Sequence, residues 1–340
     1  MGNHRDAWCF GASDPGSGTA VMLEVIRIFG ELRQLGWRPL RTIEFASWDG
    51  EEYNLIGSTE HVEARIDELR RNGFAYLNVD VAVTGTQFEA AACPIFERAL
   101  LRVLDRVTDP IKNQTLRSIW DEKSTKLQGL GADSDYVAFQ DMAGTSSIDF
   151  GFRGPPFPYH SCYDNFEWMK KFGDPGFQYH TLTAQIWALL ILEMADTPVL
   201  PFDMETYAAS VMGYVVDLEK YVEAKSAPIT SSNPDPPLDL QPLHDAADSF
   251  VENAAEFHTW DRIWSETVYG GGGFESNVMA IKRMSHNTRM ANFETHLLDV
   301  DGGVSSVLVF SLPATPFPLP HPPPQCTRCT FPSRPSTPLS

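Results

Sequence analysis

The sequence predicts an α/β fold with a mostly parallel sheet flanked by helices, followed by an α-helical bundle. Short apolar segments with strand character alternate with helical segments up to about residue 152. From about residue 174 onward, only helical patterns recur. The chain has 340 residues, of which 43% are hydrophobic, so it can bury a substantial core. Strands that alternate with helices are typical of a parallel sheet covered on both faces.

The first half supplies the predicted strands and their covering helices in turn. The first helix, residues 16–35, carries apolar side chains at helical spacing, among them Val21, Val25 and Leu32. Further patterns predict strands at residues 41–48, 74–79 and 145–152, and helices at residues 58–71, 94–107 and 133–142. Pro94 stands at the first position of its helix, where a missing N–H costs nothing.

The second half is predicted to be helical. Helical patterns cover residues 174–195, 204–224, 240–258 and 276–298, and a Pro- and Ser-rich loop at residues 226–237 interrupts them. We therefore expect three regions: an α/β domain at residues 1–198, a helical domain at residues 199–300, and a Pro-rich, disordered tail at residues 301–340.

The tail allows two interpretations. It is either a disordered extension or the translation of an unspliced intron or a shifted reading frame, and we favour the second because a well-formed helical pattern stops abruptly before it. Cys326 and Cys329 form a CxxC, which lacks a second ligand pair and is weak evidence for zinc. The five cysteines are odd in number and show no disulfide framework.

The charge balance excludes some classes of function. Lys and Arg total 26 against 45 Asp and Glu, a formal charge of −19. This argues against nucleic-acid binding, which needs a basic surface, and against a surface that attracts acidic substrates. There is no apolar run of membrane-spanning length and no signal-peptide pattern, so we expect the chain as written to be soluble, with its location open.

Acidic and histidine side chains follow the predicted strands. Because open α/β sheets place their sites at the carboxyl ends of strands, we expect these side chains to converge. They are His4, Asp6, Asp14, Glu51, Glu52, Asp80 and His160. Each alone has an ordinary alternative, such as a helix cap for Asp14 or a solvated loop for the glutamates. Together they fit two zinc ions that share one carboxylate and one water molecule.

Six motifs carry a resemblance to a known family. They are NHRD, FGASDPGSG, FASWDGEE, GSTEHVEAR, NVD and YHSCYD, and in this order they resemble the peptidase domain of glutamate carboxypeptidase II and its fungal relatives, from residue 2 to about residue 298. The resemblance implies a zinc-exopeptidase, aminopeptidase-like α/β domain followed by a helical domain like the dimerisation domain of the transferrin receptor. It further implies a peptide substrate, a homodimer through the helical domain, and two zinc ions per chain.

The same resemblance implies a role for each site residue. His4, Asp14 and Asp80 would hold one zinc ion, and Asp14, Glu52 and His160 the other, with Asp14 bridging. Glu51 would be the general base that deprotonates the bridging water and passes the proton to the leaving amine. Tyr159 would stabilise the oxyanion. Asp6 would orient the His4 imidazole. Glu60 and Glu63 match positions that help to bind calcium, although exposed helix charges are an equal alternative.

The sequence also departs from that family. The strand expected to lead into His4 is missing, so the histidine should fray, and relatives carry a membrane anchor that this sequence lacks. The pocket arginines of glutamate-preferring members are absent from residues 88–92 and 148–150, and Asp133 adds an unexpected charge. Amino- versus carboxy-terminal trimming therefore stays open. The alternatives to an enzyme are a non-catalytic, transferrin-receptor-like binding or sorting protein, or an inactive fragment that does not fold stably.

Overall fold

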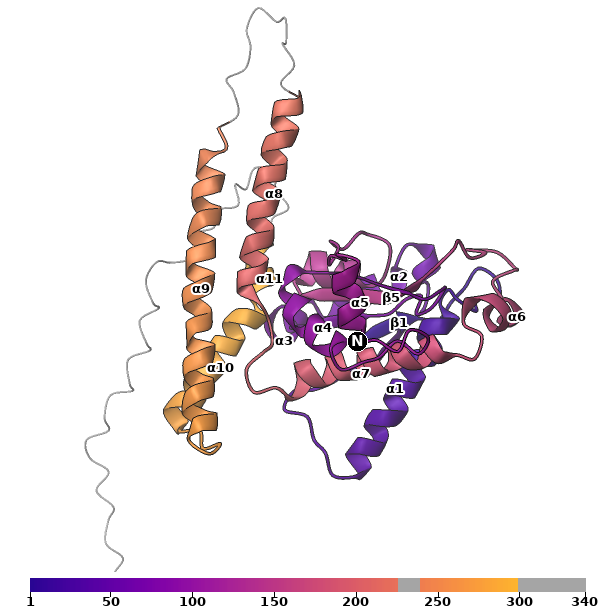
Figure 1. Cartoon of the computed structure of the whole chain (residues 1–340), viewed down its shortest axis with the longest axis horizontal. Coiled ribbons are helices and arrows are strands. Elements are labelled where there is room, and N and C mark those ends of the chain that lie inside the picture. Colours follow the sequence, from indigo (N-terminus) through magenta and orange to yellow (C-terminus); the bar gives the residue numbers. More distant parts are fainter. Residues whose placement is uncertain (226–238, 299–340) are drawn as a thin grey trace, which may run out of the picture.

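The computed structural model describes residues 1–225 and 239–298, which form an α/β part and a pair of long helices beside it (Figure 1). Within these residues one sheet has the strand order β2-β1-β3-β5-β4. The first four strands in this order run parallel, and β4 pairs antiparallel with β5 at one edge. The strands are β1 (Gly2–His4), β2 (Ala46–Trp48), β3 (Tyr76–Asn78), β4 (Gln87–Ala92) and β5 (Ser147–Arg153).

Helices cover both faces of the sheet because side chains alternate along the strands. On β3, Leu77 joins a large apolar cluster with α1, α4 and α7, whereas Tyr76 joins a smaller cluster with Trp48 and Phe139. The helices and helical turns of this part are α1 (Gly16–Gln34), η1 (Glu51–Tyr53), α2 (Ile56–Ala64), α3 (Ile66–Asn72), η2 (Pro94–Phe96), α4 (Glu97–Leu104), α5 (Leu116–Glu122), η3 (Ala138–Ala143), α6 (Phe166–Trp168), η4 (Met169–Gly173) and α7 (Gln178–Asp196).

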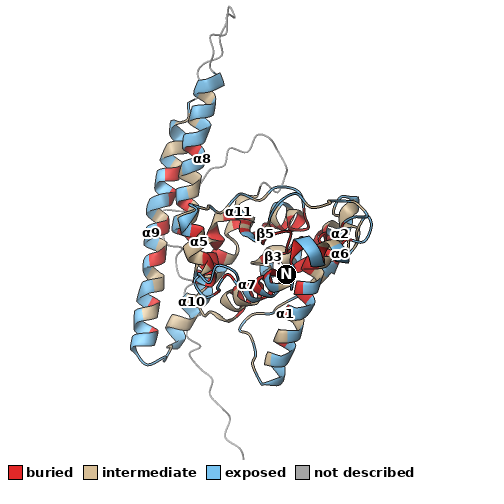
Figure 2. Ribbon diagram, turned by 45° about the vertical axis from the view of Figure 1, so that its right-hand side comes forward, coloured by how far each residue is buried: buried red, intermediate tan, exposed pale blue. Residues whose placement is uncertain are grey.

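The second part consists of α8 (Met204–Lys225), α9 (Gln241–Gly270), α10 (Asn277–Ala291) and α11 (Phe293–Leu297). The helices α8 and α9 lie side by side, and much of their length is exposed (Figure 2). Buried residues on α9 recur at helical spacing, for example Ala247, Phe250 and Ala254. Phe250 and Ala254 belong to the same apolar cluster as the sheet, so the helical part shares a core with the α/β part. The predicted fold class is confirmed.

Several predicted boundaries need correction. The strand predicted at residues 41–48 is reduced to β2, and the helix predicted at residues 58–71 breaks at Arg65 into α2 and α3. The helix predicted at residues 133–142 is the π-helical turn η3. The helix predicted at 276–298 divides at Asn292, and α9 extends twelve residues past its predicted end at His258. The sequence reading missed β4 and α5. The predictions for the loop at 226–237, the tail and its CxxC lie outside the described residues.

The strand that leads into His4 is present, which corrects the expectation that it is missing. Gly2–His4 lies between β2 and β3, and the amino group of Met1 donates to the Glu44 carbonyl oxygen at 2.9 Å. The His4 side chain is only 1% exposed, so the histidine expected to fray lies buried at the end of a paired strand. Among the described helices, none is long and apolar enough to cross a bilayer.

Candidate metal centre

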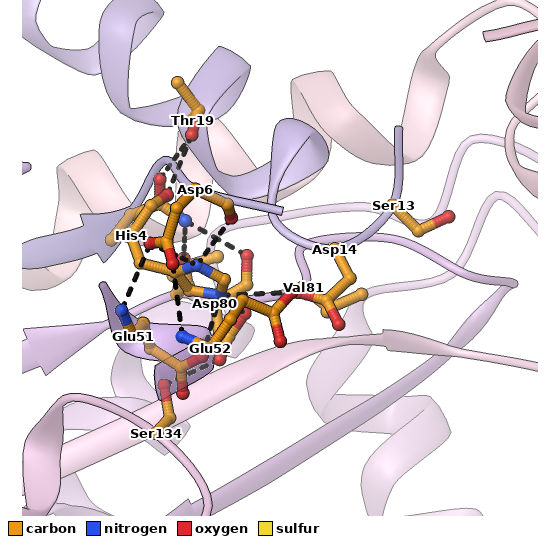
Figure 3. Close-up of polar contacts among 12 residues, drawn as sticks. His4, Asp6, Ser13, Asp14, Thr19, Glu51, Glu52, Asp80, Val81 and Ser134 are labelled. Atoms are coloured by element: carbon orange, nitrogen blue, oxygen red, sulfur yellow. Dashed lines mark hydrogen bonds and ion pairs between the residues drawn. The ribbon is translucent and has the colours of Figure 1, made fainter. Parts of the chain in front are cut away.

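Two groups of potential metal ligands meet at the carboxyl ends of the parallel strands. Figure 3 shows the four carboxylates of these groups around His4. His4 ends β1, and Asp80 lies two residues past the end of the neighbouring β3. Glu51 and Glu52 lie in η1, which follows β2 on the other side of β1. Because the strands are parallel and in register, their ends deliver these side chains to one place. The convergence expected from the sequence is therefore present.

The first group contains His4, Glu51 and Asp80, whose ligand atoms lie within 4.8 Å of one another. The His4 Nε2 atom lies 2.9 Å from Asp80 Oδ1 and 3.8 Å from Glu51 Oε2. The other carboxylate oxygen of Asp80 accepts a hydrogen bond of 2.7 Å from the Ser134 hydroxyl, which fixes its orientation. A nitrogen and carboxylate oxygens at this spacing are the donor types that zinc prefers.

The second group contains Asp14, Glu52 and His160, again within 4.8 Å. The His160 Nε2 atom lies 3.0 Å from Glu52 Oε2 and 3.2 Å from Asp14 Oδ2. The other oxygen of Asp14, Oδ1, lies 3.3 Å from His4 Nε2 in the first group. The two oxygens of one carboxylate thus face the imidazoles of the two groups.

The loop before α1 holds Asp14 in place through Asp164. The Asp164 carboxylate, buried with 2% exposure, accepts hydrogen bonds from the backbone N–H of Ser13 at 2.8 Å and of Asp14 at 3.1 Å. The Asp164 carbonyl oxygen accepts another from the Ala12 N–H. Asp164 is part of the motif YHSCYD, but the sequence predicts no role for it, because an aspartate that binds backbone N–H groups looks like any other loop aspartate.

Asp6 connects the His4 ring to the turn that carries the two glutamates. Its backbone oxygen lies 3.1 Å from His4 Nδ1, and its carboxylate lies 3.5 Å from the same nitrogen. The carboxylate also accepts hydrogen bonds from the N–H groups of Glu51 and Glu52, each at 3.2 Å. Asp6 therefore orients the imidazole, mainly through its backbone oxygen, and also anchors η1.

The electrostatics of this centre favour a cation. Burial lowers the pKa of His4, but hydrogen bonds with Asp14 and Asp80 outweigh it and raise the pKa to about 11. Burial and the neighbouring carboxylates raise the pKa of Glu51 to about 8, although the charge of His4 opposes this. Burial raises the pKa of Asp135 to about 7. Glu52 Oε1 is buried without a hydrogen-bond partner. Such crowded, partly unpaired carboxylates fit bound metal ions.

Comparisons with known proteins agree with this geometry. The model of peptidase family M28 matches residues 1–173, just over half of the chain. The chain belongs to peptidase family M28. The model of the transferrin receptor-like dimerisation domain matches residues 238–317, which include the predicted helices at residues 240–258 and 276–298 and extend past residue 300 into the predicted tail.

Curated relatives of this M28 chain carry several names. "Probable glutamate carboxypeptidase VP8" of Zea mays is 43% identical over 64% of this chain and 31% of its own length. "Aminopeptidase NAALADL1" of Mus musculus is 34% identical over 75% of this chain and 36% of its own. "Inactive zinc metalloprotease C354.09c" of Schizosaccharomyces pombe is 30% identical over 89% of this chain and 37% of its own. The chain thus spans about a third of the length of these relatives.

Tyr159 lies beside the second ligand group. Its ring stacks on His160 with centroids 3.6 Å apart, and 60% of the residue is exposed. Burial, together with the charges of Asp14, Glu52 and Glu51, raises the pKa of its hydroxyl to about 12. The hydroxyl therefore keeps its proton at neutral pH and is available as a hydrogen-bond donor.

The predicted calcium residues lie elsewhere. Glu60 and Glu63 are exposed on α2, and neither belongs to a group of potential metal ligands in residues 1–225 and 239–298.

The two segments that lack the pocket arginines lie side by side, because β4 and β5 pair residues 88–92 with residues 148–152. Asp149 accepts a hydrogen bond from Asn78, and Arg153, which the sequence reading passed over, lies 3.7 Å from Asp149. Asp133 accepts a hydrogen bond from Tyr136.

Proposed function

We propose that this M28 chain carries the active site of a zinc-dependent exopeptidase, which hydrolyses peptide bonds near a chain terminus. The observation that carries the proposal is the carboxylate of Asp14, whose two oxygens each face one histidine of the two ligand groups. This arrangement suits two cations that share a bridging ligand. The names of the relatives include both carboxypeptidases and an aminopeptidase, so either chain end is a candidate substrate.

In this proposal His4, Asp14 and Asp80 hold one zinc ion, and Asp14, Glu52 and His160 hold the other. Zinc supplies a lowered pKa of water and polarisation of the peptide carbonyl. Glu51, whose Oε2 lies 3.8 Å from His4 Nε2, takes a proton from the attacking water and delivers it to the leaving amine. The Tyr159 hydroxyl donates a hydrogen bond to the developing oxyanion. Asp6 orients the His4 ring and holds the η1 turn in position beside it.

The mechanism is tested by Glu51→Gln in the zinc-reconstituted chain. The amide cannot accept the proton, so we expect peptide hydrolysis to fall by at least about 10²-fold, while zinc content stays the same. The matched control is Glu24→Gln on the exposed surface of α1, which should keep full activity. Unchanged turnover in Glu51→Gln would rule out the assigned base.

The second candidate is a non-catalytic binding protein, because one relative is named inactive. Metal analysis separates the two candidates. About two zinc ions per purified chain supports the peptidase, and zinc-free protein that still assembles supports the binding module.

We further propose a homodimer through the region that matches the dimerisation domain. Light scattering at several concentrations tests it, and a monomer at all of them counts against it.

A further inference from the structure

Two exposed cysteines lie together beside the candidate metal centre. The Sγ atoms of Cys9 and Cys162 are 2.7 Å apart, although 153 positions separate them in the sequence. Cys9 lies three residues after Asp6, and Cys162 lies two residues after His160. The sequence alone indicated no disulfide framework. The fold therefore creates a thiol pair that spacing could not reveal.

The backbone around these thiols is already fixed in a paired arrangement. Asp164 binds the loop of residues 12–14 through its carboxylate and its carbonyl oxygen. The Cys162 carbonyl oxygen accepts a hydrogen bond from the Asn165 side chain at 3.2 Å. The Trp8 ring lies against His160, with centroids 6.1 Å apart. Because both loops are held in place on either side of the sulfurs, a bond of about 2.05 Å needs only small side-chain movements.

We infer that Cys9 and Cys162 form a disulfide that fastens the loop carrying His160 to the loop that follows His4. The oxidant is a low-molecular-weight disulfide such as oxidised glutathione. The thiolate of one cysteine attacks it, forms a mixed disulfide and releases one reduced thiol. The second cysteine, as thiolate, attacks the protein sulfur of that mixed disulfide and releases the second reduced thiol. Two electrons pass to the oxidant, and the two cysteine protons end on the released thiols.

The cross-link would limit how far His160 can move away from its partners. The side chain of His160 is 33% exposed, and its backbone has a left-handed φ of 54°. Its contacts with Asp14 and Glu52 depend on a surface loop, whereas His4 lies inside the sheet. A covalent tie two residues away from His160 compensates for this difference. It also closes a long chain loop, which stabilises a fold by restricting the unfolded chain.

Peptide mapping of the full chain tests the inference directly. The folded protein is treated with oxidised glutathione, its free thiols are alkylated, and it is digested with trypsin. We expect residues 6–27 and residues 154–170 to appear as one cross-linked species that reduction separates. Cys93, which is buried and donates to Gln140, should remain a free thiol in the same sample and serves as the internal reference.

Two variants and one physical readout complete the test. Cys9→Ser and Cys162→Ser should each abolish the cross-linked species, so either one suffices if the other fails to fold. The oxidised wild-type chain should melt several degrees above its reduced form, and neither variant should show this dependence on reductant. Glutathione adducts without a cross-link, alkylation of both thiols, or pairing of either one with Cys326 or Cys329 would each overturn the inference.

Discussion

Asp14 connects the two ligand groups, because among residues 1–225 and 239–298 its carboxylate is the one that pairs with both His4 and His160. Its residue exposure is 7%, and its backbone N–H donates a hydrogen bond of 3.1 Å to the Asp164 carboxylate, which holds it in place. Asp14→Asn keeps the size of the side chain but replaces one anionic oxygen by an amide that cannot bind a cation. We expect zinc content to fall from about two ions per chain to one or fewer, measured by atomic emission.

A matched control is available in Asp49→Asn. Asp49 lies three residues before Glu52, but its side chain is 70% exposed and pairs only with Arg5 in the described contacts. The control variant should retain the zinc content and the peptide hydrolysis of the parent chain. Full zinc occupancy in Asp14→Asn would show that this carboxylate does not bridge the two groups.

Asp164 acts on the centre through the backbone rather than by touching a ligand atom. In Asp164→Asn one of the two oxygens becomes an NH₂ group, which would face the N–H of Ser13 or of Asp14. Two donors cannot pair, so the loop must shift and carry Asp14 away from His160. We expect zinc affinity to weaken by about 10–100-fold, measured by competition with a chelator. Asp67→Asn on exposed α3 should leave the affinity unchanged.

The site could be predicted residue by residue only where residue type itself carries the chemistry. His4, Asp14, Glu52, Asp80 and His160 could be singled out because imidazoles and carboxylates at strand ends indicate metal binding. The structure brings these side chains together, and metal binding by them stays a prediction. Asp164 was missed because an aspartate that accepts backbone N–H groups looks like any loop aspartate. The contact between Cys9 and Cys162 depends on how two distant loops fold, and no local pattern encodes that.

At the scale of elements, the start of α1 lies close to the segment that follows β3 and carries Asp80. Gly18, in the first turn of α1, approaches the backbone oxygens of Val79 and Asp80, and a Cβ atom there would collide with both. Gly18→Ala should therefore destabilise the fold by about 1–3 kcal/mol through overpacking. It should also weaken zinc binding, because relief of the collision moves Asp80. Thermal unfolding and zinc titration measure the two effects.

The same helix contains a glycine whose replacement by alanine should change the stability in the opposite direction. Gly30 lies near the other end of α1, and a Cβ atom there would meet nothing within 4 Å. Gly30→Ala should stabilise the chain by about 0.5–1 kcal/mol, because alanine loses less conformational freedom in a helix than glycine does. If both alanine variants stabilised the chain, close approach at Gly18 would not explain the packing.

The predictability of elements followed their length and the strength of their pattern. The helices α1, α7 and α8 lie close to their predicted bounds because many apolar positions repeat along them. The strand β4 was missed because the sequence QFEAAA is rich in alanine, which has little strand preference of its own and gains it from pairing with β5. Likewise, no pattern in the local sequence predicts the break between α2 and α3 at Arg65.

At the scale of the whole molecule, the predicted fold class, a sheet part followed by a helical part, is confirmed. The two parts nevertheless share one apolar cluster. Phe96 of η2 meets Phe202 with centroids 5.3 Å apart, and Phe202 leads directly into α8. Sequence periodicity shows which face of a helix is apolar, but not which partner that face will cover. The contact between the two parts was therefore not predictable from the chain alone.

Phe250 tests this shared core most directly. It is 3% exposed on α9 and stacks on Phe293 of α11, with centroids 5.5 Å apart, while Tyr207 of α8 lies at 6.0 Å. Phe250→Ala should cost about 3–5 kcal/mol of unfolding free energy. Because the cluster is continuous, one cooperative transition should shift as a whole, whether it is followed by helix content or by zinc release.

Val251, the neighbour of Phe250 in the sequence, is 41% exposed and gives the control Val251→Ala, which should change the free energy of unfolding little. Loss of the helical signal alone, with zinc retained to the original melting temperature, would mean that the two parts unfold independently.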